Sequence, residues 1–272
     1  MPALPTDIIL VRHGQSEGNR AIRASQKGNN RFFTPEFRSR HSRTFRLTDQ
    51  GIAQAKAAGE WLKKNIPMPL DRFYVSDYIR AKETAAYLNL PNAVWQVEFH
   101  LRERDYALID NCPEDEKKNL FALEQKQYEA DPFLSYPAGG GESLASLCLR
   151  QKATMIAHWA RECSDKRIIA VCHGHVMRAI QIEFEDMGHD DFIRLDASEK
   201  AADKIRNCQI LWYTRRDSEK HIIKPHLVAV RSVCPLGPDG ALEDHGWQRI
   251  KRHRYTNQDL LAEVNRYPRH IS

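Results

Sequence analysis

The chain has 272 residues, and 42% of them are hydrophobic, so it can bury one large core or two small ones. No run approaches the roughly 20 apolar residues that span a membrane, and the first residues lack the pattern of a secretory signal. The net charge of +5 comes without a nucleic-acid recognition motif, and the six cysteines form no Cys-x-x-Cys pair, which together predict a cytoplasmic protein that binds neither membranes nor nucleic acid. No Gly/Ser- or Pro-rich linker divides the chain, so we expect a single domain over residues 1–272.

The first predicted element is a buried strand over residues 8–11 that ends abruptly at Arg12 and His13. In α/β folds ligands collect at the carboxyl ends of the strands, so this Arg-His pair is placed to meet one. Arginine offers a planar fork of donors that suits phosphate, and neutral histidine is a nucleophile near neutral pH. We expect Gly14 to leave room for the backbone to approach the ligand, and Asn19 to add an uncharged donor.

A basic insertion over residues 20–46 follows this loop and holds seven arginines, Lys27 and a single acid, Glu36. Because the chain must leave and return close to the loop, we expect a mobile lid whose arginines contact an anionic part of a substrate. The arginines of this expectation are Arg31, Arg38, Arg40 and Arg43. The alternative is a solvated basic loop with no role.

A helix is predicted to begin at Thr48, a suitable N-cap, and to run through Lys64. A strand over residues 73–75 then leads into a second helix, which carries Arg80 in its first turns. Arg80 is a candidate ligand for phosphate. The alternative is a surface ion pair between Arg80 and Glu83, which lie at helix spacing.

The charged stretch over residues 102–106 contains a candidate general acid, Glu103. The alternative for Glu103 is membership of a solvated charge cluster, and Asp105 is a nearby competitor for its role.

A helix beginning at Ser143 precedes a second buried strand, over residues 168–172, and that strand ends in His173, Gly174 and His175. The chain therefore sends a buried strand into a His-Gly turn twice. The alternative for His173 is a structural histidine whose ring nitrogens are hydrogen-bonded within the core. The spacing of the two histidines is one that metal sites use, but no acid or cysteine lies nearby at ligand spacing, so we expect no metal.

Two late strands are predicted, over residues 208–213 and 222–230. A C-terminal extension from about residue 214 ends in a basic run and a short amphipathic piece around Leu260 and Leu261. The alternation of strand and helix patterns argues for an α/β fold with a mainly parallel sheet and helices on both faces.

Five motifs resemble those of the histidine phosphatase superfamily, the phosphoglycerate-mutase-like proteins, in the order that the family has them. They lie at residues 12–19, 76–85, 101–106, 141–144 and 172–174, and the resemblance covers about residues 7–213. It implies a three-layer α/β/α sandwich and a small phosphorylated substrate, with no cofactor.

The resemblance and the chemistry of the residues together imply a phosphohistidine mechanism. His13 attacks phosphorus through one ring nitrogen, while a backbone carbonyl holds the other and fixes the tautomer. His173 donates a hydrogen bond to the oxygens as charge builds, and Glu103 is first the acid for the leaving group and then the base for water. The residues expected to bind phosphate or substrate are Arg12, Gly14, Asn19, Arg80, Arg104, Tyr106 and Gly174.

Three departures from the family pattern bear on the activity. Cys172 stands where the family often has serine, and Ala107 stands where glycine is common. Residues 108–140 lack the Trp-Arg-Arg-Ser element with which cofactor-dependent mutases hold a second phosphate. The sequence therefore favours a metal-independent phosphomonoesterase acting through a phosphohistidine at His13. A phosphoglycerate mutase-type phosphotransferase and a non-catalytic module that binds a phosphorylated ligand stay as alternatives, and nothing indicates the oligomeric state.

Overall fold

The computed structural model describes residues 3–217, 219–237 and 239–271. Its centre is a seven-stranded sheet with the order β3-β2-β4-β1-β5-β8-β9. The strands β3, β2, β4 and β1 run parallel, and β5, β8 and β9 continue the sheet in antiparallel pairs. The strands are β1 Asp7–Arg12, β2 Arg72–Ser76, β3 Trp95–Glu98, β4 Arg167–Cys172, β5 Ile210–Thr214, β8 Ala229–Cys234 and β9 Glu243–Arg249.

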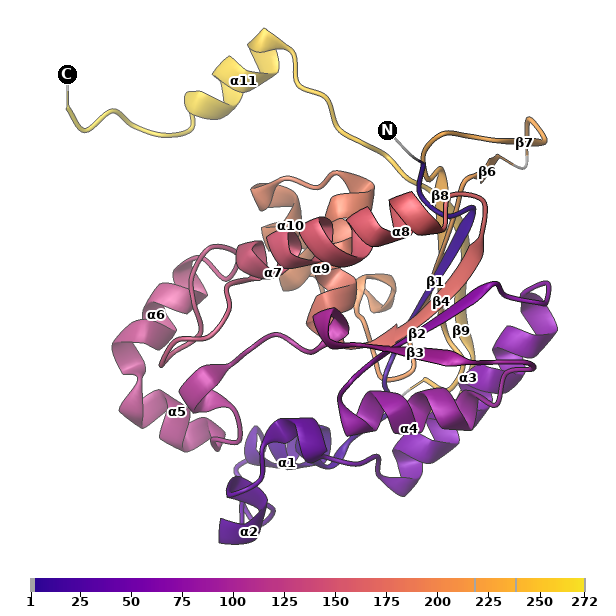
Figure 1. The fold of residues 1–272 in the computed structure, drawn as a ribbon. Helices are drawn as coiled ribbons and strands as arrows, with labels where there is room; N and C mark the ends of the chain where they lie inside the picture. The colour runs from indigo at the N-terminus through magenta and orange to yellow at the C-terminus, as the bar shows by residue number, and fades with distance from the viewer. Residues whose placement is uncertain (1–2, 218, 238, 272) are drawn as a thin grey trace.

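Helices cover both faces of this sheet (Figure 1). Along β1, Ile8 and Leu10 pack into a core shared with α7, α8, α9 and α10, whereas Ile9 and Val11 pack into a core shared with α3 and α4. Residues 7–11 of this strand are buried because they alternate between the two faces and both faces are covered. The three-layer α/β/α fold and the mostly parallel sheet predicted from the sequence are confirmed.

The helices begin where the sequence places capping side chains. Thr48 accepts a hydrogen bond from Gly51 N at the start of α3, and Ser143 accepts one from Ser146 N at the start of α7. The helices of the two layers are α3 Asp49–Asn65, α4 Ile79–Leu88, α7 Leu144–Gln151, α8 Ala157–Glu162, α9 Gly174–Glu185 and α10 His189–Ala197, with a π-helical turn over Lys152–Ile156.

The late strands differ in part from the prediction. The strand expected over residues 208–213 is β5, displaced by a residue or two. The one expected over residues 222–230 is wrong, because the chain forms β7 (Ile222–Ile223) against β6 (Arg216–Asp217) and re-enters the sheet only at β8. Pro225 interrupts this stretch, and proline cannot donate a ladder hydrogen bond.

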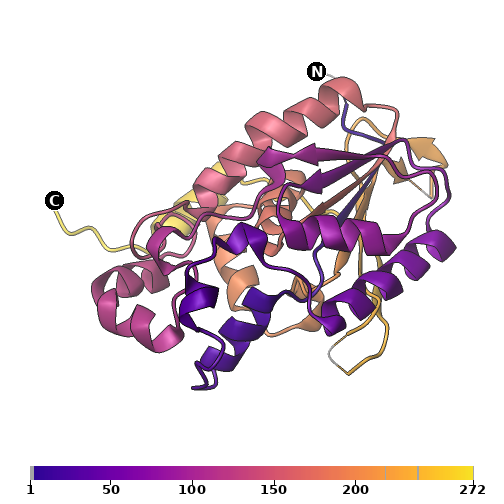
Figure 2. The ribbon, with the colours of Figure 1, turned by 60° about the horizontal axis from the view of Figure 1, so that its bottom comes forward.

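Two segments lie outside the layers, beyond the carboxyl ends of the parallel strands. The insertion contains most of α1 (Glu17–Ser25), together with α2 (Pro35–Arg38) and a 3₁₀ turn over Ser42–Thr44. It lies beside α5 (Glu114–Leu120) and α6 (Ala122–Ala130), as Figure 2 shows. Arg38 donates two hydrogen bonds to Glu116, and Asn30 donates one to Asp115. The insertion is therefore tied to α5.

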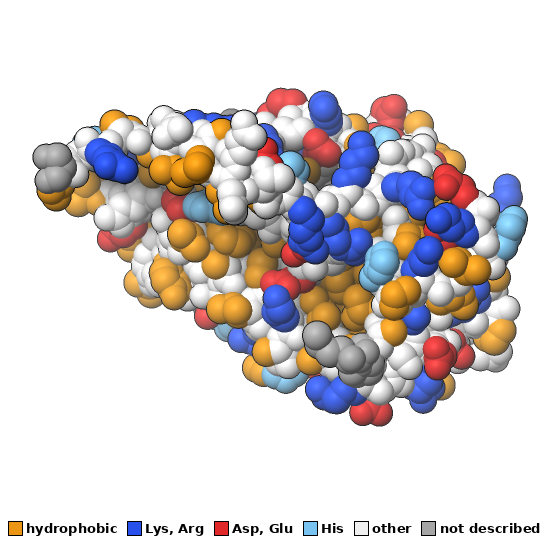
Figure 3. All heavy atoms as spheres, turned by 90° about the horizontal axis from the view of Figure 1, so that it is seen from above, with side chains coloured by type: hydrophobic (Ala, Val, Ile, Leu, Met, Phe, Trp, Pro, Cys, Tyr) orange, Lys and Arg blue, Asp and Glu red, His pale blue; other side chains and the backbone are white. Residues whose placement is uncertain are grey.

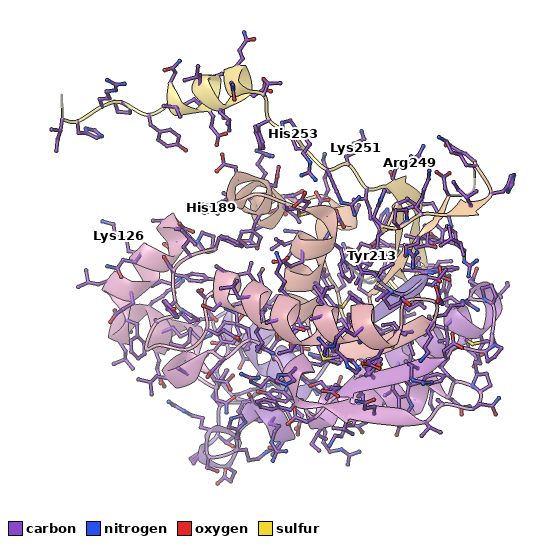
Figure 4. The ribbon with its side chains drawn as sticks, turned by 45° about the horizontal axis from the view of Figure 1, so that its top comes forward. Lys126, His189, Tyr213, Arg249, Lys251 and His253 are labelled. Carbon is purple, nitrogen blue, oxygen red and sulfur yellow. The ribbon has the colours of Figure 1, made fainter. Side chains whose placement is uncertain are left out.

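The C-terminal residues leave the body of the molecule as an arm (Figure 3). The arm begins near His253 and carries α11 (Asn257–Val264), the helix expected around Leu260 and Leu261, both of which are exposed (Figure 4). In the part of the chain that the structure describes, no helix has both the length and the apolar character needed to cross a membrane.

Candidate active site

The carboxyl ends of three neighbouring parallel strands bring the predicted central residues together. Arg12 ends β1, Ser76 ends β2, and His173 follows β4 at the N-terminus of α9. The rings of His13 and His173 meet edge to face with their centroids 5.1 Å apart. Arg80, in the first turn of α4, reaches the same point and is buried.

The hydrogen bonds of His13 assign its tautomer. Nδ1 lies 2.7 Å from the carbonyl oxygen of Gly14, and Nε2 accepts a hydrogen bond from Arg80 Nε at 3.1 Å. Burial, followed by the charges of Arg80 and Arg12, holds the pKa of His13 well below its usual value. The imidazole is therefore neutral near pH 7, with a proton on Nδ1 and a lone pair on Nε2.

Two arginines and His173 surround His13 with hydrogen-bond donors. Arg12 Nη1 donates to the carbonyl of Ile205 at 2.7 Å, and Arg80 Nη1 donates to the carbonyl of Ser42 at 2.8 Å. Within the described residues, Arg12 Nε and His173 Nδ1 are buried without a partner. Unpaired buried donors of this kind are costly, and an anion that accepts their hydrogen bonds would remove that cost.

The surface ion pair considered for Arg80 does not form. Glu83 accepts hydrogen bonds from Arg46 Nη2 at 2.6 Å and Leu47 N at 2.8 Å. The alternative that His173 is a hydrogen-bonded histidine of the core holds for one ring nitrogen, because Nε2 lies 2.8 Å from Ser76 Oγ. The other, Nδ1, has no hydrogen-bond partner among the described residues and can bind a ligand.

Glu103 lies at the edge of this group and not in a solvated cluster. Its carboxylate oxygens are 3.9 Å from Nδ1 of His173 and 3.9 Å from Nδ1 of His175. Burial raises the pKa of Glu103 above its usual value, and the charge of Arg80 opposes the shift. Asp105, the competitor for its role, is exposed, and its side chain accepts a hydrogen bond from Ala107 N at 2.8 Å.

A pocket of about 530 Å³ opens from His13, and several further candidates line it. Arg104 is buried, with its guanidinium over the rings of Tyr106 and Tyr128 at 5.5 and 5.4 Å. The hydroxyl of Tyr106 lies 3.1 Å from the ring nitrogens of His175. Asn19 lines the pocket as well, so these three predicted residues are brought to one site.

The two predicted glycines act through the backbone and do not line the pocket. A Cβ on Gly14 would lie 2.4 Å from the carbonyl oxygen of Gly51, so the glycine is required by the approach of α3. A Cβ on Gly174 would lie 3.3 Å from Arg12 Nε. The packing of α3 thus gives Gly14 a structural reason, and its expected role in the approach of a ligand stays a prediction.

The arginines of the insertion are used differently from the expectation. Arg38 pairs with Glu116, Arg40 with Glu17, and the guanidinium of Arg31 lies 4.8 Å from the ring centroid of Phe32. The insertion residues that line the pocket are Ile22, Arg23, Gln26, Phe33, Phe37, Ser42 and Phe45. None of the four arginines named for the lid lines the pocket, and the insertion presents there a largely apolar set of side chains with Arg23. Contact between the lid and a substrate stays a prediction.

Some residues of the site escaped the sequence reasoning. His175 was weighed only as a metal ligand, although it follows the second His-Gly turn and lines the pocket. Asn207 carried no local signal, yet its Nδ2 donates to Asn19 Oδ1 at 2.9 Å and its Oδ1 accepts from Arg23 at 2.9 Å.

One group could offer ligands to a metal. Single atoms of His13, Glu103 and His173 lie within 4.8 Å of one another. The guanidinium groups of Arg12 and Arg80 stand beside them, and their positive charge favours an anion over a cation at this place.

Comparisons with known proteins identify the family to which this chain belongs. The family model of the histidine phosphatase superfamily (branch 1) matches residues 8–220. A 2,3-bisphosphoglycerate-dependent phosphoglycerate mutase of Methylobacterium radiotolerans is 29% identical over 64% of this chain and 76% of its own, and one of Methylobacterium sp. (strain 4-46) is 30% identical over 64% and 77%.

The solved structures that resemble this fold include phosphatases. A mycobacterial glucosyl-3-phosphoglycerate phosphatase superposes with a TM-score of 0.58 and 20% identity, covering 76% of this chain and 92% of that one. An alpha-ribazole phosphatase from Shigella flexneri superposes with a TM-score of 0.59 and 16% identity, covering 76% and 89%. At these identities the likeness concerns the fold.

Proposed function

Because this chain belongs to the histidine phosphatase superfamily, we propose that it is a metal-independent phosphomonoesterase that works through a phosphohistidine at His13. The observation that supports this most is the state of the imidazole. His13 is buried, neutral and hydrogen-bonded through Nδ1 to a carbonyl, so Nε2 presents a lone pair beside two arginines. A phosphoryl group needs such a nucleophile together with neutralisation of its oxygens.

The reaction runs in two balanced steps. In the first, Nε2 of His13 forms a bond to phosphorus while the bond to the leaving oxygen breaks, and Glu103 gives that oxygen its proton. In the second step, Glu103 takes a proton from a water molecule while the oxygen of that water forms a bond to phosphorus. The bond between phosphorus and Nε2 breaks, which releases inorganic phosphate and restores His13. Arg12, Arg80 and His173 stabilise the equatorial oxygens in both steps by charge-assisted hydrogen bonds.

The outer wall of the pocket favours hydrolysis over phosphate exchange between two sites of one substrate. Asp110 and Glu114 line that wall, and Lys117, which lines it too, lies 3.0 Å from Glu114. Lys117 compensates the charge of Glu114, so Asp110 is the carboxylate of this wall that opposes a second phosphate. Mutase activity stays the second candidate because the curated relatives are mutases. Interconversion of phosphoglycerates primed by 2,3-bisphosphoglycerate, exceeding the release of phosphate, would establish it.

The decisive experiment traps the intermediate. A labelled phosphomonoester, mixed rapidly with the protein and quenched, is expected to leave an acid-labile, base-stable phosphoryl group on the chain, unaffected by a metal chelator. His13→Ala should abolish this label and lower turnover by about three decades or more, because no neighbour replaces a nucleophile.

A matched control is His189→Ala, which removes an exposed histidine at the start of α10 (labelled in Figure 4) that does not line the pocket. It should keep both the label and the turnover. Label or near-native turnover in His13→Ala contradicts the mechanism, and tight binding of phosphate esters without turnover by the native protein supports the binding module instead.

A further inference from the structure

The pocket has an apolar wall that phosphoryl transfer does not need. Ile22, Phe33 and Phe37 of the insertion line one side of it, and Ile109 of the 3₁₀ turn before α5 lines it as well. None of these side chains can hold phosphate. These side chains would therefore contact the leaving group, which is the part of a phosphomonoester that extends away from His13.

The aromatic side of this wall is rigidly built. Phe37 stacks on Phe45 with a centroid distance of 4.4 Å and an interplanar angle of 12°, and Phe33 meets Phe37 edge to face at 5.5 Å. Phe45 is buried against Gly18, where a Cβ would lie 2.9 Å from its ring. Phe33 and Phe37 are only half-buried, so their rings have faces left to contact a ligand.

The insertion is also fixed to the opposite side of the pocket. Arg38 holds Glu116 through both guanidinium nitrogens, at 2.7 and 2.8 Å, and Asn111 Nδ2 donates to the carbonyl of Arg40 at 2.6 Å. Arg40 in turn pairs with Glu17 at 2.7 Å. The apolar wall is thus in place before a ligand arrives, which lowers the entropic cost of binding one.

The charges of the outer pocket select further. Asp110 disfavours an acidic group next to Ile109, while Glu114 is paired with Lys117, and Arg23, which donates to the neutral side chain of Asn207, keeps its positive charge. A small polar leaving group such as glycerate would leave the apolar faces in water. An aromatic group would remove them from water and stack on the phenylalanine rings.

We propose that the substrate, if the phosphatase function holds, is a phosphomonoester whose leaving group carries an uncharged aromatic part that packs on Phe33 and Phe37. The phosphoryl group occupies the space beside His13, and the ring lies between the insertion and Ile109.

A matched pair of esters tests this. Ethyl phosphate and 2-(2-naphthyl)ethyl phosphate both release a primary alkoxide, so their chemical steps are alike and they differ in the apolar part. The native protein should show a kcat/KM at least about 10-fold higher for the naphthyl ester, equivalent to about 1.4 kcal/mol, mainly through a lower KM. Phe33→Ala should reduce this preference to about 2-fold.

The matched control is Phe32→Ala, which removes the neighbouring ring, one that does not line the pocket and lies instead between Arg20 and Arg31. It should keep the preference. Equal kcat/KM values for the two esters, or a preference for 3-phosphoglycerate over the naphthyl ester, overturn the proposal.

Binding to His13→Ala separates this proposal from the catalytic one. Calorimetric titration of that variant with each ester measures the preference without turnover. Tighter binding of the naphthyl ester by His13→Ala supports the aromatic site, and if the native protein then turns over neither ester, the phosphatase function alone is contradicted. Equal affinities would overturn the aromatic site whatever the turnover.

Discussion

Replacement of Glu103 by glutamine tests the assignment of the proton donor. The carboxyl is largely buried and lies 3.9 Å from His173 Nδ1, and this burial raises its pKa, so it keeps its proton to a higher pH than an exposed glutamate. Glutamine preserves the size of the side chain and cannot give up a proton. General acid catalysis contributes a factor of about 10²–10⁴ in rate, or about 3–5 kcal/mol of barrier. The kcat/KM of Glu103→Gln for an alkyl phosphate should therefore fall by that factor.

The same variant should lose no more than about 10-fold in kcat/KM with p-nitrophenyl phosphate, whose leaving group needs little protonation. Its kcat should fall with both esters, because hydrolysis of the phosphohistidine also needs the Glu103 carboxylate. The assay is steady-state release of phosphate from both esters over a range of pH. With the native protein, kcat/KM for the alkyl ester should fall as the pH rises through the raised pKa of Glu103, and Glu103→Gln should lack this alkaline fall.

Asp105→Asn is the matched control for this assignment. Its side chain is exposed and caps Ala107 N, so the change should alter turnover less than about 3-fold with either ester. Equal losses of kcat/KM for the two esters in Glu103→Gln would refute the reasoning. A loss of kcat/KM in Asp105→Asn that is larger for the alkyl ester would move the role of proton donor to Asp105.

Two further outcomes follow from the packing and the charges of the site. Gly51→Ala should destabilise the fold by about 2–4 kcal/mol in urea unfolding, because its Cβ would lie 2.1 Å from the carbonyl oxygen of Gln15; an unchanged midpoint contradicts that contact. His13 and His173 have pKa values lowered chiefly by burial, so their contribution to stability is complete above the unfolded value of about 6.5 and is lost as the pH falls below it. The free energy of unfolding should therefore drop between pH 7.5 and pH 5, and a smaller drop is expected in His173→Asn.

The centre of the site was predictable because each of its residues follows from local sequence. An apolar run that stops at Arg12 predicts a buried strand, and parallel strands bring their carboxyl ends to one edge, so His13 and His173 had to meet. Capping by Thr48 and Ser143 fixed the helix starts for the same reason, since a cap acts within four residues.

The late strands show where such reasoning stops. The apolar residues near Ile222 predict a strand, but strand pairing depends on a partner elsewhere in the chain and on free backbone donors. With Pro225 in the stretch, Ile222 and Ile223 pair with β6 in a separate ribbon instead of joining the sheet.

The insertion was misjudged for a physical reason that also identifies its role. A basic segment next to a phosphate loop predicts anion ligands only if its arginines lack other partners, and Arg38 finds Glu116, which lies 78 residues along the chain. No local sequence pattern predicts that two residues so far apart along the chain lie side by side in the fold. Once such carboxylates hold the arginines, the segment is fixed in place with Phe33 and Phe37 lining the pocket. The paired arginines thus serve the attachment of the insertion, and its apolar residues in the pocket are the ones on which the proposed aromatic site rests.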